Sequence, residues 1–281
     1  MSVLVVWRNI VDGKTTSVYM AADSRFTFNG RHFDYGKKVF ACKNDASLFG
    51  YCGNITYATY VIQSVVDLIE AGVLYKKDDT CDDRAKIVAA KLSELWDNMQ
   101  GIVKPDKTTI IYCTAVSNTK LSQIYKIVLM SNGQYTCEPI DLEGVKSAYS
   151  TEYIQYCVIG SGQDAYNARY LSYKGVPRLE ENKFGYITSE IIFRTLVDII
   201  KDATSKDDYG GYPQLAYIYN NKRSRTKLCG TYFNNEFYLG GTRVDIANDN
   251  DFARTLKWFD EDFKLRDPIT KERKYMQQKQ T

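Results

Sequence analysis

Three side chains near the start of this sequence could act together without a cofactor: Ser2, Asp23 and Lys38. Asp23 ends one apolar stretch, and Lys38 immediately precedes another. The simplest interpretation of Asp23 and Lys38 is a buried structural ion pair. If Met1 is removed, however, Ser2 carries both an α-amine and a hydroxyl. A lysine held beside it by Asp23 would then ease loss of the hydroxyl proton. The three residues therefore suggest an N-terminal nucleophile.

The proton acceptor in such a site would be the α-amine of Ser2 itself. Its reference pKa of about 7.7–8 leaves part of it neutral near pH 7, so it can take the hydroxyl proton directly or through water. The sequence has one histidine, His32, in a polar stretch expected to be a solvated loop. Ser-His-Asp and Cys-His catalysis are therefore disfavoured, whereas an N-terminal nucleophile needs no histidine.

The cysteine pattern argues against a metal site. The seven cysteines are scattered, and no two of them have C-x-x-C spacing. Several lie in apolar runs, where a thiol behaves as a small hydrophobic side chain. We therefore expect reduced, structural cysteines, and neither a metal nor a cofactor.

Charge and hydropathy limit the partners. The formal net charge of the 281 residues is +3 and 25% of them are charged, a balance that does not favour nucleic acid or an anionic membrane as the main partner. No apolar run approaches the roughly 20 residues of a membrane helix, and the first residues lack a basic signal-peptide region. We therefore expect a cytoplasmic protein.

The hydrophobic pattern changes period along the chain. Strands are expected at 3–7, 15–22, 39–42, 47–52, 108–116, 124–130, 135–140, 153–159, 215–219, 228–233 and 237–239. Asp12-Gly13 is a type I′ hairpin signal between the first two strands. Helical spacing is expected near 61–72, 82–99, 163–171 and 189–203.

This order is strands, two helices, strands, two helices, strands. Because hairpin turns join many of the strands, the sheets should be largely antiparallel, and the fold class α+β. Two helix pairs with two sheets suggest a four-layer αββα sandwich in residues 1–244. Residues 245–281 are charged and contain Trp258, Phe259 and Phe263 in one helix-like patch, so they are expected to form a C-terminal extension.

Five motifs follow one another in the order of a known family. They are Ala21-Ala22-Asp23-Ser24-Arg25, Lys37-Lys38-Val39, Phe49-Gly50-Tyr51-Cys52-Gly53-Asn54, Ile159-Gly160-Ser161-Gly162 and Asp207-Asp208-Tyr209-Gly210-Gly211. Over roughly residues 2–220 the chain resembles proteasome β-type subunits, and it is similar also to their bacterial relatives of the HslV and ancestral β-subunit (Anbu) groups. That family of N-terminal-nucleophile (Ntn) hydrolases has the αββα sandwich.

The resemblance implies a role for each matching position. Ser2 aligns with the nucleophile, Asp23 with the nearby acid, Lys38 with the lysine, and Gly53 with the glycine whose N–H stabilises the oxyanion. Ser161 and Asp207 align with the serine and aspartate that support the amine. Positions that line the side-chain pocket match Phe26, Phe40, Tyr51 and Ile55, which implies a preference for apolar or aromatic substrates.

The resemblance also implies partners and leaves alternatives. Family members cleave peptide bonds of unfolded protein in homo-oligomeric rings or spirals, often fed by an ATP-dependent unfoldase. In this chain serine replaces the commoner threonine nucleophile, and Gly210 stands where many members have a further supporting serine. A catalytically silent scaffold or binding subunit is therefore an alternative, and an amidase acting on a small metabolite is another.

Overall fold

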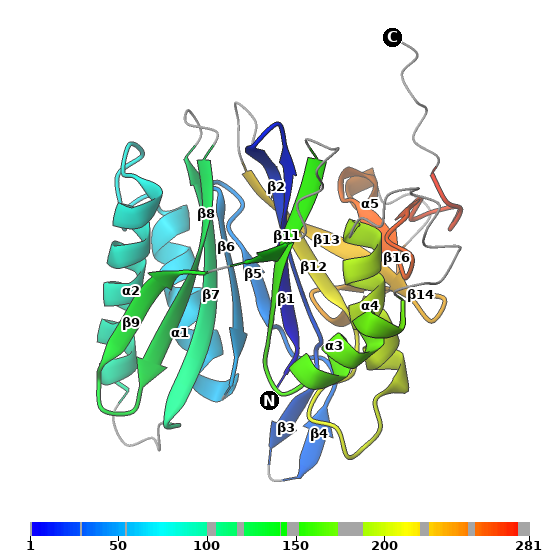
Figure 1. The fold of residues 1–281 in the computed structure, drawn as a ribbon, viewed down its shortest axis with the longest axis horizontal. Helices are drawn as coiled ribbons and strands as arrows, with labels where there is room; N and C mark the ends of the chain where they lie inside the picture. The colour runs from blue at the N-terminus through cyan, green and yellow to red at the C-terminus, as the bar shows by residue number, and fades with distance from the viewer. Residues whose placement is uncertain are drawn as a thin grey trace.

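The protein is described by a computed structural model. The residues described are 2–28, 30–53, 55–99, 105–116, 121–140, 142–144, 152–173, 188–219, 225–246 and 251–274. The expected order of strands and helix pairs is confirmed in these residues (Figure 1). The helices are α1 (Ile55–Glu70), α2 (Cys81–Asp97), α3 (Gln163–Ser172), α4 (Ser189–Asp202) and the short α5 (Asp251–Thr255).

The strands form two larger sheets and a small hairpin. They are β1 (Leu4–Val11), β2 (Lys14–Ala22), β3 (Phe26–Phe28), β4 (Arg31–Phe33), β5 (Val39–Ala41), β6 (Ser47–Cys52), β7 (Lys107–Val116), β8 (Leu121–Met130), β9 (Tyr135–Pro139), β10 (Glu143–Gly144), β11 (Glu152–Ile159), β12 (Gln214–Tyr219), β13 (Arg225–Phe233), β14 (Glu236–Leu239), β15 (Thr242–Val244), β16 (Trp258–Asp260) and β17 (Leu265–Arg266). Among the described residues, the larger sheet has the order β10-β11-β1-β2-β12-β13-β14-β15, with β16 and β17 joined through β13. The second sheet has the order β5-β6-β7-β8-β9, and β3 pairs with β4.

Pairing in these sheets is antiparallel except between β13 and β16, so the expected α+β fold with largely antiparallel sheets is confirmed for the described chain. The turn at Asp12 and Gly13 has φ angles of 50° and 72°, the positive values that a type I′ hairpin requires. This turn places β1 and β2 side by side, between β11 and β12.

The β1–β2 hairpin is buried on both of its faces over 4–7 and 17–22, away from its turn. Alternate residues such as Val5 and Trp7 pack in one apolar cluster with α4, whereas Leu4 and Met20 pack in another with residues of the five-stranded sheet. Since successive side chains of a strand point to opposite faces, a hairpin between two apolar layers must be apolar at nearly every position. This explains the continuous apolar stretch that runs into Asp23.

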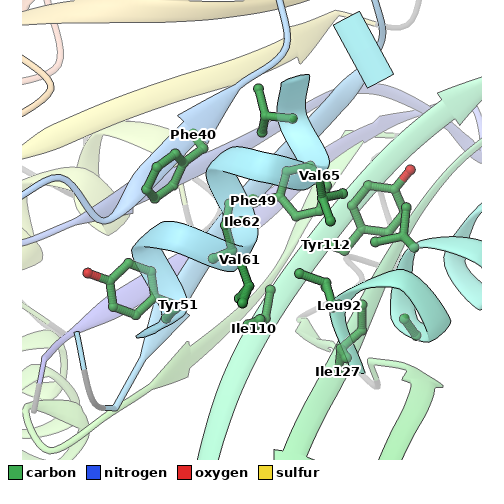
Figure 2. Packing of buried hydrophobic residues seen from close by; sticks show 14 of the residues in the cluster. Phe40, Phe49, Tyr51, Val61, Ile62, Val65, Leu92, Ile110, Tyr112 and Ile127 are labelled. Atoms are coloured by element: carbon green, nitrogen blue, oxygen red, sulfur yellow. The ribbon is translucent and has the colours of Figure 1, made fainter. Parts of the chain in front are cut away.

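Helices α1 and α2 cover the other face of the five-stranded sheet. Val61, Ile62 and Val65 of α1 meet Ile110 and other residues of the sheet in a third cluster (Figure 2). In Figure 1 these two helices lie on one flank of the molecule, and α3 and α4 lie against the larger sheet on the other. Thr80 and Thr188 cap α2 and α4 by accepting hydrogen bonds from backbone N–H groups.

The C-terminal segment differs from the sequence prediction. Trp258 and Phe259 do not belong to one helix with Phe263: they lie in β16, and Phe263 follows in a turn with φ of 58°. The reason is that β16 finds a strand partner, since Phe259 is in register with Thr231 of β13. Phe259 and Phe263 also pack in the α4-facing cluster, so residues 258–266 complete this layer. No helix in the described parts of the chain is long and apolar enough to cross a membrane.

Candidate active site

Asp23 is the centre of the candidate site. It follows the last residue of β2 and is fully buried. Its Oδ1 atom accepts hydrogen bonds from Lys38 Nζ at 2.8 Å and from the Val3 N–H at 2.9 Å. Its Oδ2 atom accepts from the N–H groups of Arg25 and Gly210, both at 3.1 Å. A buried carboxylate is costly unless it is paired and hydrogen-bonded, and both requirements are met here.

Lys38 reaches Asp23 from the segment that leads into β5. Its side chain is 1% exposed, so the ion pair with Asp23 lies out of contact with bulk water. The ring of Phe26 lies over this lysine, with its centroid 5.9 Å from Nζ. The sequence prediction that Asp23 and Lys38 pair, and that they do so beside the N-terminal residues, agrees with this geometry.

Ser2 lies next to this ion pair and is 1% exposed. Its N–H donates to Ser161 Oγ at 3.1 Å, and its carbonyl accepts from the Gly162 N–H at 3.2 Å. Gly160, with φ of 106°, permits this approach, because a Cβ atom there would lie 2.1 Å from the Ser2 carbonyl oxygen. The structure therefore brings Ser2, Ser161, Asp23 and Lys38 together from four separate segments.

Gly53 directly follows β6, which ends at Cys52. Its φ of 125° is a conformation that favours glycine. The preceding residue, Cys52, donates its thiol to the Ile159 carbonyl at 3.5 Å, just before Gly160. Burial raises the pKa of Cys52 to about 12, more than the nearby Lys38 cation lowers it. This thiol is therefore protonated at neutral pH and is not an activated nucleophile.

Asp207 has partners of its own in the turn that follows α4. Its carboxylate accepts from the Thr204 N–H at 2.7 Å and from Thr204 Oγ1 at 2.8 Å, and these bonds lower its pKa. The backbone carbonyls of Thr204 and Asp207 accept from the guanidinium of Arg25. Arg25 also pairs with Asp34 at 2.7 Å. Arg25 thus links the two aspartates: its N–H donates to Asp23, and its guanidinium donates to the turn that contains Asp207.

The four expected pocket residues occupy different environments. Phe40 and Tyr51 are 1% and 0% exposed and belong to the core under α1, as Figure 2 shows. Tyr51 donates its hydroxyl to the Lys37 carbonyl at 3.3 Å. Phe26 is half-buried near Lys38, and the side chain of Ile55 lies outside the described part. Phe26 contacts the ion pair through Lys38.

Sequence reasoning missed Gln214, the first residue of β12. It is fully buried, and its amide contacts the backbone on both sides of the ion pair, near Asp23 and near Lys38. The sequence offers a weak signal, namely a polar residue directly before the apolar run Leu215–Tyr219. A glutamine at the end of a strand is ordinarily exposed, so its burial could not be inferred.

The histidine is also placed differently from the expected solvated loop. His32 lies in β4, where Nε2 is 2.7 Å from the Ser205 carbonyl and Nδ1 is 3.1 Å from Thr27 Oγ1. Because a carbonyl can only accept, Nε2 carries a proton. His32 therefore ties the β3–β4 hairpin to the 204–212 turn. In the described residues, no three His, Cys, Asp or Glu side chains gather in a way that could hold a metal ion.

Chemically, the site offers a buried cation, a compensating carboxylate and a backbone nitrogen of Ser2 that already has a hydroxyl partner. No protein-family model matches the sequence, and no curated protein does. Among solved structures, the chain is similar to the Gly-1 mutant of Anbu from Hyphomicrobium sp. strain MC1, with a TM-score of 0.49, 10% sequence identity and 91% of each chain covered. At this level the likeness assigns neither an activity nor a role to any residue.

Proposed function

We propose that this chain is an N-terminal-nucleophile hydrolase that cleaves peptide or other amide bonds through Ser2, after removal of whatever precedes it. One observation carries the proposal: Asp23 Oδ1 binds both Lys38 Nζ and the N–H of the residue that follows Ser2. A buried ammonium is thereby fixed one residue from the proposed nucleophile, and the Ser2 nitrogen rests on Ser161 Oγ.

The proposed reaction has two steps. The neutral Ser2 amine takes the hydroxyl proton while Oγ attacks the substrate carbonyl, and the negative charge of the tetrahedral intermediate is stabilised by the Gly53 N–H. Collapse releases the leaving amine, which receives that proton, and leaves an acyl-enzyme. Water then attacks the ester with the same amine as the base, and Ser2 is regenerated. Lys38 favours the deprotonated oxygen throughout, and Ser161 orients the amine.

We also propose the four-layer αββα sandwich of proteasome β-type subunits for the fold. Three apolar clusters support it: one between α1–α2 and the five-stranded sheet, one between the two sheets, and one between the larger sheet and α3–α4. Assembly into a homo-oligomeric ring or spiral in the cytoplasm, served by an unfoldase, follows from the same resemblance. Asp207 would support the Ser2 amine indirectly, through Arg25, which binds both the Asp207 carbonyl and Asp23.

The substrate preference proposed is apolar or aromatic. Phe26 supports it, because its half-buried ring borders Lys38 and contacts Phe33 with a centroid distance of 6.0 Å. Phe40 and Tyr51 would support the proposed substrate pocket from the core, since both side chains are buried there.

A catalytically silent binding subunit is the second candidate, and a specific observation favours it. Both oxygens of Asp23 have two donors each, as in a structural ion pair, and Ser2 is 1% exposed. A site complete in this way can exist for stability alone.

Two measurements on the purified protein separate the candidates. Intact and N-terminal peptide masses report whether Ser2 is the first residue. An epoxyketone or β-lactone probe is then incubated with the wild type, Ser2→Ala and Ser2→Thr. The hydrolase predicts labelling of the wild type and Ser2→Thr, and none of Ser2→Ala. Protein that cleaves peptides while it retains residues before Ser2 would refute this mechanism, and absence of label in all three would favour the binding subunit.

A further inference from the structure

The buried amide of Gln214 bridges the two segments that carry the ion pair. Its Oε1 accepts from the N–H groups of Lys38 at 3.0 Å and Val39 at 3.3 Å. Its Nε2 donates to the carbonyls of Gly36 at 2.7 Å and Asp23 at 3.3 Å. Both donor hydrogens and both acceptor positions of one side chain are thus used by backbone groups.

The orientation of this amide is determined by its partners. Backbone N–H groups can only donate and carbonyls can only accept, so oxygen must face Lys38 and nitrogen must face Gly36. Gly241, with φ of 84°, closes over the other side, where a Cβ atom would lie 3.1 Å from Gln214 Nε2. The amide is therefore enclosed by these groups, and it cannot turn without breaking several hydrogen bonds at once.

Gln214 also connects the two sheets at this point. It is the first residue of β12 in the larger sheet, in register with Ala22 at the end of β2. Val39, whose N–H it binds, begins β5 of the five-stranded sheet. The segment 36–39 that delivers Lys38 crosses between these sheets, and its backbone is held to β12 by this side chain.

We propose that Gln214 is a positioning residue that fixes the backbone of Lys38, and so holds the ammonium beside Asp23 and Ser2. Its importance for catalysis rests on the function proposed above, whereas its hold on Lys38 does not. Without the amide, the N–H groups of Lys38 and Val39 and the carbonyl of Gly36 lose a buried partner. The 36–39 segment then shifts, and Lys38 becomes accessible and is displaced from the nucleophile.

The test compares Gln214→Met with Thr231→Val in the full chain. Methionine has a similar length and no hydrogen-bonding amide. Thr231 is buried and donates its hydroxyl to the Pro213 carbonyl at 2.9 Å, so its replacement by valine removes a buried hydrogen bond at the same strand entry without touching Lys38. Circular dichroism and thermal unfolding establish that each variant is folded at the assay temperature.

Two readouts are then taken. Acetylation of Lys38 by a succinimidyl ester, followed by peptide mass mapping, reports its accessibility whether or not the protein is an enzyme. The rate at which a β-lactone labels Ser2, measured across pH, reports reactivity. In Gln214→Met, Lys38 should be acetylated about tenfold faster than in the wild type, and Ser2 should be labelled about 10- to 100-fold more slowly. Half-maximal labelling of Ser2 should also move to higher pH, because a displaced Lys38 cation no longer favours the neutral form of the Ser2 amine. Thr231→Val should match the wild type in the acetylation rate of Lys38, the labelling rate of Ser2 and the pH of half-maximal labelling.

Each outcome bears on the proposal separately. Unchanged acetylation and labelling in folded Gln214→Met would overturn it. Faster acetylation of Lys38 in a protein whose wild type is never labelled at Ser2 would support the positioning role and favour the binding subunit over the hydrolase. If Gln214→Met does not fold, Gln214→Glu keeps the acceptors for Lys38 and Val39 but loses the donors to Gly36 and Asp23. It should shift both readouts in the same direction, and wild-type values would overturn the proposal.

Discussion

Val3 and Asp23 bind each other twice: the Val3 N–H donates to Asp23 Oδ1 at 2.9 Å, and the Asp23 N–H donates to the Val3 carbonyl at 3.2 Å. This reciprocal pair joins the start of β1 to the end of β2, directly beside Ser2. The Asp23 carboxylate therefore stabilises the fold as well as forming part of the candidate site. Measurements of stability and of activity can separate these two roles.

Asp23→Asn should destabilise the protein by about 3–5 kcal/mol, because it leaves the Lys38 ammonium buried without a counter-charge. Urea unfolding followed by tryptophan fluorescence measures this loss. Glu94→Gln is the control, since it breaks the exposed pair with Lys91 and should cost less than about 1 kcal/mol. Equal losses in the two variants would contradict a buried, charged pair. Adding Lys38→Met to Asp23→Asn should recover part of the loss.

Gly160→Ala should cost far more stability than Gly13→Ala. Both glycines have positive φ, so both substitutions carry the left-handed penalty of about 1–2 kcal/mol. At Gly13 nothing lies within 4 Å of the new Cβ, whereas at Gly160 it meets the Ser2 carbonyl oxygen at 2.1 Å. Overpacking adds about 1–3 kcal/mol there and displaces Ser2. The denaturant midpoints of Gly160→Ala and Gly13→Ala test which variant is less stable. Similar midpoints would refute the close packing of Gly160 against Ser2.

Phe40→Ala should behave as a core substitution. Its ring is 1% exposed beneath α1, so its loss should lower stability by about 3–5 kcal/mol. Phe26→Ala, at a half-buried position, should cost less and change the preference for substrate side chains instead. Melting temperatures together with cleavage of a panel of short peptides distinguish the two. A stable Phe40→Ala with altered preference would place Phe40 in the pocket directly.

The stability contributed by Asp267 should disappear in acid. Hydrogen bonds from the N–H groups of Thr270 and Ile269, and then the Lys274 ammonium, lower the pKa of Asp267 to about 2. A depressed carboxyl pKa stabilises the fold above the unfolded pKa of about 4, and this contribution is lost as pH falls towards 2. Because this carboxylate lies at the surface, solvent screens part of that contribution, and Asp267→Ala should lose about 1 kcal/mol at pH 6.

Thermal unfolding of the wild type and Asp267→Ala at pH 6, 4 and 3 measures this difference. The gap between the two proteins should narrow below pH 4. A gap that stays constant would show that the 267–271 turn is held by something other than this carboxylate.

Cys52 should resist alkylation in the folded protein. Burial raises its pKa to about 12, so at pH 8 its thiolate fraction is roughly a thousandfold below that of an ordinary cysteine. Iodoacetamide treatment of native and urea-unfolded protein, with peptide mass mapping, gives the ratio of rates. The same measurement is a control for the labelling of Ser2, because rapid alkylation of Cys52 in the native protein would make this cysteine a competing target for an electrophilic probe.

Much of the fold could be predicted because its signals are local. The positive φ angles at Asp12 and Gly13 and the apolar spacing of α1 each follow from a few neighbouring residues. The β3 and β4 strands were missed because they lie in a polar stretch that contains Gly30 and Gly36, a composition typical of a loop. The helix expected around Phe259 was wrong because β13 supplies it with a strand partner from elsewhere in the chain.

In the candidate site, too, the residues with local sequence signals could be predicted and those without could not. Asp23 and Lys38 stand in recognisable local patterns, and the ion pair between them was predicted. Gln214 lies 176 residues from Lys38, and its role depends on which strand β12 pairs with, which no local pattern specifies. The expected support from Asp207 stays a prediction, since its carboxylate binds Thr204.

The pairing of β1 with β11, a strand far later in the chain, also has a consequence for biosynthesis. Ser161 and Gly162, which bind the Ser2 backbone, are synthesised about 160 residues after it. At a translation rate of about 5–20 residues per second, Ser2 stays outside any finished fold for roughly 10–30 s on the ribosome. Afterwards it is 1% exposed. If Ser2 is to become the first residue, peptidases that act on nascent chains have this interval in which to reach it, and slow-folding variants would extend it.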